Sequence, residues 1–144
     1  MFWSSTLMLL VPLAAGHGAT PEDAAKKELQ LFQGIWKAIA VQNADGNRAP
    51  EDDVRNTRLV VEGNKFTLTS KNATIAGTFT INPTKTPKTI DVRLESNEGK
   101  ETKLLGIYQI KGGTRKSCFA FPGKDRPTRF STEKEYIGFE WQRK

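Results

Sequence analysis

The sequence predicts an all-β fold, namely an eight-stranded antiparallel up-and-down barrel with a short N-terminal helix. Eight short β-like segments follow one another from residue 34 onward, joined mostly by tight turns and with no helical pattern between them. Apolar and polar side chains alternate in several of them, as in a sheet with one face in water. Closure into a barrel would remove the exposed edges of such a meander, and a two-sheet sandwich is the alternative.

Residues 1–16 are predicted to be a secretory signal peptide. The apolar run from Leu7 to Ala15 is far shorter than the roughly 20 residues of a membrane-spanning helix. Ala14 and Gly16 place small side chains where a signal peptidase cleaves. We therefore expect cleavage after Gly16, an extracytoplasmic (periplasmic or secreted) location, and no transmembrane segment in the mature chain. An uncleaved anchor is the alternative, because the first six residues contain no Lys or Arg.

Residues 17–33 are predicted to form an N-terminal segment with a short helix, and residues 34–144 to form the barrel. Thr20 is the expected helix cap, Pro21 the first helical residue, and Phe32 lies near the expected end. A polar segment with Pro50 and three acids separates the first two strands, and a long basic loop precedes the last. The expected strands are residues 34–43, 58–62, 65–70, 73–81, 89–96, 102–111, 114–121 and 136–143.

Alternation assigns one apolar face to three of the central strands. These inner-face residues are Phe66, Leu68, Ile75, Phe79, Ile81, Ile90, Val92 and Leu94. In the first strand both alternating sets of residues are apolar, so the sequence does not decide which set faces inward. One set is Ile35, Ile39 and Val41, and the other is Trp36, Ala38 and Ala40. If the N-terminal helix covers the outer side of that strand, Leu29 and Phe32 are core residues. An eight-stranded barrel is either filled by its side chains or holds one small ligand.

Several short motifs follow one another in a recognisable order. Gly34-Ile35-Trp36 comes first, followed by Pro87-Lys88-Thr89-Ile90-Asp91, Gly106-Ile107-Tyr108, Cys118-Phe119-Ala120 and the segment 122–130. The first motif resembles the Gly-x-Trp signature of lipocalin-like (calycin) barrels, and the set in this order resembles a small planctomycete family of secreted domains of unknown function with that fold. The resemblance implies a fold and an envelope-facing location, and it brings no established activity. It also implies structural roles for Gly34 and Trp36, with a basic residue of the last strand over Trp36; Arg143 is the candidate, and Arg126 and Arg129 are rivals.

The composition excludes much catalytic chemistry. His17, at the edge of the predicted leader, is the only histidine, and Cys118 is the only cysteine. Catalytic triads need an imidazole base, and zinc sites or redox pairs need more His or Cys than this chain has. We therefore predict a protein that is not an enzyme, with no catalytic residues, cofactor or metal, and we expect Cys118 to be buried. The leader argues against nucleic acid as a partner.

Positive charge is concentrated near the C-terminus. Residues 111–144 contain nine Lys and Arg and four Asp and Glu, so they carry five of the six net positive charges. Such a segment attracts anions. Lys124, Arg126 and Arg129, in the basic loop, are the candidate contacts for an anionic envelope polymer or a partner protein; a solvated surface without a partner is the alternative.

Two functions follow from these patterns. The first is a lipocalin-like module that binds a small apolar or amphipathic ligand, with Trp36, Phe66, Phe79 and Tyr108 as candidate lining residues. Trp36 has a second interpretation, as a structural plug at the closed end of the barrel. The alternative function is a filled-barrel interaction module that uses the basic loop.

Overall fold

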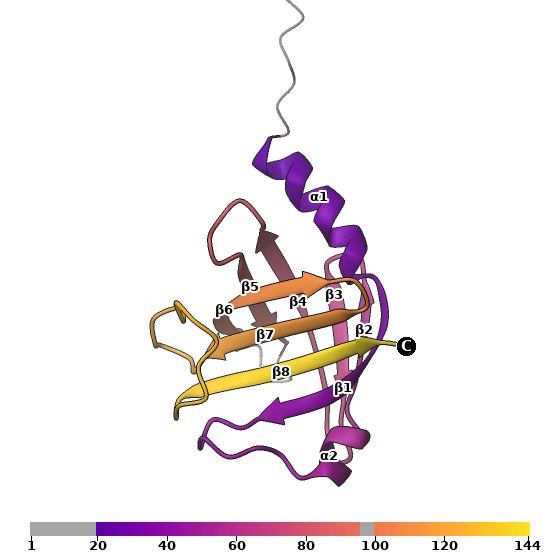
Figure 1. Ribbon diagram of the computed structural model, residues 1–144, viewed down its shortest axis with the longest axis vertical. Coiled ribbons are helices and arrows are strands. Elements are labelled where there is room, and N and C mark those ends of the chain that lie inside the picture. The colour runs from indigo at the N-terminus through magenta and orange to yellow at the C-terminus, as the bar shows by residue number, and fades with distance from the viewer. Residues whose placement is uncertain (1–19, 96–99) are drawn as a thin grey trace, which may run out of the picture.

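The computed structural model describes residues 20–95 and 100–144, and these form a closed antiparallel barrel flanked by two helices (Figure 1). The predicted leader, residues 1–16, lies outside the described residues. In chain order the elements are α1 (Pro21–Phe32), β1 (Gly34–Gln42), α2 (Glu51–Arg55), β2 (Arg58–Glu62), β3 (Lys65–Thr69), β4 (Thr74–Asn82), β5 (Thr89–Leu94), β6 (Thr102–Lys111), β7 (Thr114–Ala120) and β8 (Tyr136–Arg143).

Each strand pairs with the next along the chain, and β8 pairs with β1 to close the sheet. The predicted barrel is therefore confirmed, and the sandwich alternative is wrong. Predicted and observed strand ends agree within two residues. Among the helices of the described residues, none is long and apolar enough to cross a membrane.

Helix α2 was not predicted. It has five residues, follows Pro50, and carries Glu51, Asp52 and Asp53 in its first turn. So short a helix shows no 3.6-residue apolar period, which is the signal that identifies helices in sequence. Its acids favour this position because they lie at the positive end of the helix dipole.

Helix α1 starts and ends as predicted. The hydroxyl of Thr20 accepts a hydrogen bond from the N–H of Asp23 at 3.1 Å, which caps the first turn. At the other end Phe32 is completely buried. Its ring makes an edge contact with Tyr108, with centroids 5.1 Å apart, and lies 5.6 Å from Phe79. Through Phe32, α1 closes one end of the barrel, and α2 lies at the opposite end (Figure 1).

The structure decides which face of β1 points inward. Trp36 and Ala38 are buried, whereas Ile35 and Ile39 are 41% and 46% exposed on the outer side. The expectation that α1 covers the outer side of β1 is wrong, because the helix closes the barrel end instead. Phe32 is nevertheless a core residue, and Leu29 packs partly buried against the core.

The inner face predicted for β3, β4 and β5 is confirmed. Phe79, Ile90 and Val92 are buried, and the other predicted inner residues pack against them or line the interior. Ile75, near the start of β4, is the half-exposed one, at 39%. The alternating pattern fixes the register of these strands, because a slip by one residue would turn every apolar side chain into water.

Phe32→Ala tests the closure by α1. The substitution removes a fully buried ring, so we expect it to lower the free energy of unfolding by about 3–5 kcal/mol. The neighbouring Leu31 is 50% exposed, and Leu31→Ala is the control, with an expected change within about 0.5 kcal/mol. Denaturant unfolding measures both. Equal losses in the two variants would contradict the role given to Phe32.

Candidate functional site

The barrel interior contains a partly open cavity of about 200 Å³ whose wall is almost entirely apolar. Residues from α1 and all strands except β1 contribute to it. Its lining comprises Phe32, Leu59, Val61, Phe66, Leu68, Ile75, Phe79, Ile90, Val92, Leu94, Leu104, Tyr108, Arg115, Ser117, Phe119, Ile137, Phe139 and Trp141. The interior is therefore only partly filled by its own side chains.

Two glycines let aromatic rings lie flat against the wall of this cavity. A Cβ atom at Gly77 would lie 2.9 Å from the ring of Phe66, and one at Gly106 would lie 2.5 Å from the ring of Phe119. A Cβ atom at Gly77 would also collide with the backbone oxygen of Arg93, and one at Gly106 would lie 2.8 Å from the backbone oxygen of Cys118. Neither position has room for a side chain, and each ring occupies the space that one would take.

Among the described residues that line the cavity, Arg115 alone carries a formal charge. The side chain is only 7% exposed, and its guanidinium carbon lies 4.8 Å from the ring centroid of Phe32 and 5.0 Å from that of Trp36. Its Nε is buried without a hydrogen-bond partner. Burial, together with the nearby positive charge of Arg143, lowers the pKa of Arg115 to about 9. The group therefore remains charged at neutral pH.

The tyrosine hydroxyl on the wall is already engaged. Tyr108 donates its hydroxyl hydrogen to Glu28 of α1, and Lys88 lies 2.5 Å from the other oxygen of the same carboxylate. Burial and the adjacent Glu28 raise the pKa of Tyr108 well above its usual value. These contacts fasten α1 to β6 and to the start of β5, so they hold the closed end in place.

Trp36 lies under the closed end, beyond the cavity wall. Its indole Nε1 donates to the carbonyl of Phe32 at 2.8 Å, and the guanidinium carbon of Arg143 lies 4.7 Å from its ring centroid. Arg143 also donates to the carbonyls of Leu31 and Gln33, at the end of α1. Arg143, and neither Arg126 nor Arg129, is thus the last-strand cation over Trp36. Gly34 has a φ of 110°, a backbone conformation that favours glycine.

The four predicted ligand-lining residues divide. Phe66, Phe79 and Tyr108 line the cavity, whereas Trp36 does not and has the geometry of the structural plug. The sequence analysis did not identify Arg115 as an inner residue. In a strand alternate residues share a face, so Phe119, Ser117 and Arg115 point the same way. This alternation was not apparent because β7 is buried on both faces near its end, where Cys118 and Ala120 are also buried.

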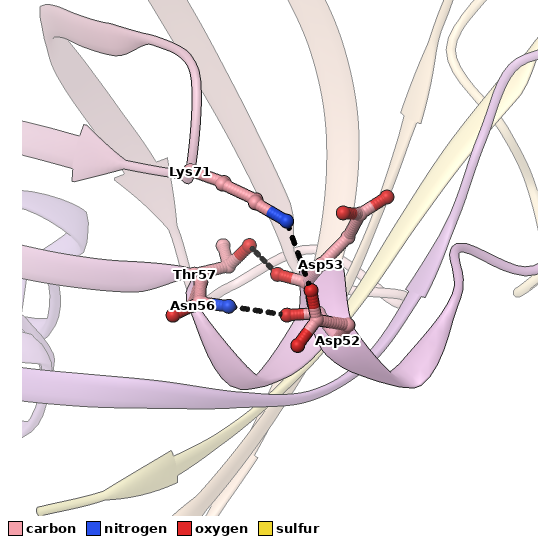
Figure 2. A network of polar contacts seen from close by, with 5 residues as sticks. All are labelled: Asp52, Asp53, Asn56, Thr57 and Lys71. Atoms are coloured by element: carbon pink, nitrogen blue, oxygen red, sulfur yellow. Dashed lines mark hydrogen bonds and ion pairs between the residues drawn. The ribbon is translucent and has the colours of Figure 1, made fainter.

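The opposite end of the barrel, beside α2, has a hollow at its surface. The hollow has a volume of about 290 Å³, and Leu68, Ile137 and Phe139 line both the hollow and the inner cavity. Asp53 of α2, Thr57 and Lys71 are among the residues that line the hollow. Figure 2 shows the polar contacts that join these residues and their neighbours. Thr57 donates to the carbonyl of Asp53 at 2.7 Å, and Lys71, in the β3–β4 turn, lies 3.1 Å from Asp52. These polar contacts hold this side of the hollow, and the apolar residues lie deeper.

The three cations predicted to bind anions all have carboxylate partners within the chain. Lys124 lies 3.5 Å from Glu135, and Arg129 lies 3.2 Å from Glu133. Arg126 lies 2.5 Å from Asp91 and also donates to the carbonyls of Gly106, at 2.8 Å, and Ile90, at 3.2 Å. Arg126 therefore fastens the β7–β8 loop to β5 and β6.

A second cationic surface was not predicted. A groove of about 600 Å³ on the outer side of the barrel is bordered by α2 and the outer faces of β1, β2 and β3. Four cations line it, and none of them has an ion-pair partner in the part of the chain that the structure describes. These are Lys37, Arg55, Arg58 and Lys144. The residues come from distant parts of the chain, so no local run of charge announced the groove.

Cys118 is buried, as predicted, and its thiol lies 3.9 Å from the carbonyl oxygen of Ser131. Burial raises the pKa of this thiol. A raised pKa keeps the thiol protonated at neutral pH and therefore a poor nucleophile.

Comparison of the chain with protein-family models, with curated proteins and with solved structures finds no match. The functional argument therefore rests on the geometry of the barrel itself.

Arg126→Ala tests the loop attachment. The variant leaves Asp91 and two carbonyls without their donor, so we expect a loss of about 1–3 kcal/mol in the free energy of unfolding. Arg129→Ala, in the same loop, removes an exposed ion pair and is expected to change stability by no more than about 1 kcal/mol. Thermal or denaturant unfolding measures the stability of both variants. A larger loss of stability in Arg129→Ala than in Arg126→Ala would mean that Arg129, and not Arg126, attaches the loop to the barrel.

Proposed function

We propose that the protein is an extracytoplasmic, lipocalin-like binding module whose barrel holds a small apolar or amphipathic molecule. The observation that supports this function is the cavity of about 200 Å³ inside the barrel, with its apolar wall. Apolar walls with a few placed polar groups are typical of small-molecule sites. The extracytoplasmic location rests on the predicted leader, and the family assignment rests on the spaced motifs.

The size of the cavity limits the ligand. Drug-sized molecules occupy pockets of roughly 300–1,000 Å³, so this barrel suits a smaller one. The apolar wall runs from Arg115 near the closed end to Leu68 and Ile137, which also line the hollow beside α2, so a single short hydrocarbon chain is the expected ligand. The unfilled interior also favours this function over a module whose barrel is completely filled.

Filling the cavity tests the proposal. Val92 is buried on the wall, so Val92→Phe should occupy the space that a ligand needs. Thr80→Phe places the same ring on the exposed outer side of β4 and is the matched control. Native mass spectrometry of gently purified protein, followed by calorimetric titration with decanoate and decanol, measures carried and added ligand.

We expect the starting protein and Thr80→Phe to take up at least one of these probes, and Val92→Phe to lose at least about tenfold in affinity. Circular dichroism checks that both variants fold, because overpacking costs about 1–3 kcal/mol. Binding that is unchanged in a folded Val92→Phe would place the ligand outside the cavity. Failure of every probe to bind the starting protein would count against the proposed function.

A second function, attraction of an anionic polymer or partner protein, is supported by the outer groove with its four cations. Because loop residues Lys124, Arg126 and Arg129 already have carboxylate partners, the groove offers charge that is less neutralised. Groove cations, more than loop cations, would then determine retention on an anionic matrix.

Salt elution from a sulfated-polysaccharide column tests this second function. We expect the double variant Lys37→Ala, Arg58→Ala to elute at clearly lower salt than the starting protein. The control Lys124→Ala, Arg129→Ala removes the same net charge from the loop and should shift elution less, because those cations are paired. Equal shifts would mean that only net charge matters, and a larger shift in the control would return the site to the basic loop.

A further inference from the structure

The buried guanidinium of Arg115 is the least satisfied polar group on the cavity wall. A guanidinium has five N–H donors, and the structure gives this side chain no hydrogen-bond acceptor among the described residues. Its near neighbours are the rings of Phe32 and Trp36. Aromatic faces attract a cation but accept few hydrogen bonds from it, so the donors remain unused.

Charge balance around Arg115 is also incomplete. Arg143, the charged group that acts on the pKa of Arg115, is itself positive. The carboxylate of Glu28, at the same end of the barrel, is already shared between Lys88 and Tyr108. Arg143 satisfies its own donors on the carbonyls of Leu31 and Gln33, and Arg115 has no equivalent. Burying a charge without a partner is costly, so an anion in the cavity would be strongly favoured at this position.

From this geometry we propose that the ligand carries one anionic group, of the carboxylate class, which binds Arg115 while its apolar chain extends toward Leu68 and Ile137 at the open end. This inference rests on the proposed function, because it specifies the chemistry of the same cavity. Arg suits such a group, since its planar fork donates two parallel hydrogen bonds to a carboxylate. Ser117, the next inward residue of β7, adds a hydroxyl on the same wall.

The direction of the ligand follows from the placement of polar and apolar groups. Arg115 is the second residue of β7 and contacts Phe32, so the charge lies at the end that α1 closes. The wall from there to the hollow is formed mostly by Phe, Leu, Ile and Val side chains, with Ser117 as a polar group next to Arg115 along β7. An anionic amphiphile would therefore enter with its charged group first and leave the end of its chain near the hollow beside α2.

The test compares two probes of equal chain length, decanoate and decanol, on the full chain at pH 7 and low salt. Calorimetry or a dye-displacement titration measures affinity. We expect decanoate to bind about 10- to 100-fold more tightly than decanol, which corresponds to hydrogen bonds to a charged group. Decylammonium, with the same chain and opposite charge, is expected to bind more weakly than decanol.

The variant Arg115→Met keeps an unbranched side chain and removes the charge. We expect it to lose the preference for decanoate and to bind decanol as well as the starting protein does. Arg129→Met removes one positive charge from the exposed loop and should keep the preference, which controls for net charge. The comparison of probes on the unaltered protein decides the question even if Arg115→Met does not fold.

Equal binding of decanoate and decanol to the cavity would overturn the inference and leave the proposed function intact. A preference for decanoate that persists in folded Arg115→Met would also overturn it, because the anion would then bind another cation. Binding that Val92→Phe does not weaken would place the probe outside the barrel and overturn both the inference and the proposed function.

Discussion

The pairing of β8 with β1 is the constraint on which the rest of the structure depends. It removes both sheet edges, and it sets the C-terminal strand beside the first one, with Arg143 directly opposite Trp36. A bulge between Ala38 and Ala40 shifts the register of this pair, so that Val41 packs against the core although it does not share the phase of Trp36 and Ala38. Without closure neither the cavity nor the sealed end would form.

The sealed end contains two arginines near one indole ring, and they differ in how their charge is satisfied. Arg143 lies toward the surface, donates to the carbonyls at the end of α1, and so joins the helix to the barrel. Arg115 lies inside, against the ring faces of Phe32 and Trp36, and its side chain makes no hydrogen bond among the described residues. Fold maintenance explains the first arginine fully and the second only in part. A residue that costs stability without making internal hydrogen bonds is the kind of group that binding sites retain.

Most of the fold could be predicted from the sequence because strand periodicity and turn residues are local signals. Phe66, Leu68, Ile90 and Val92 were assigned to the interior by alternation alone, and Gly112-Gly113 marked a hairpin. The inner face of β1 could not be predicted, since Ile35, Trp36 and Ile39 are all apolar and only the closed barrel separates an inside from an outside. The site was harder to predict. Closure of the barrel brings Arg115 of β7 near Trp36 of β1, and pairing of β1 with β2 places Lys37 opposite Arg58, so no short stretch of sequence encodes either arrangement.

The two phenylalanines that lie over Gly77 and Gly106 make the barrel wall unusually easy to remodel. The ring of Phe66 lies over Gly77 and the ring of Phe119 lies over Gly106, so each ring covers a residue that has no side chain. The close backbone oxygens at both glycines leave no room for a side chain there. Shortening either ring would therefore deepen the chamber by nearly the whole volume of that ring. In a lineage carrying this barrel, a single codon change at either ring could therefore alter the size and shape of the interior without altering the strands.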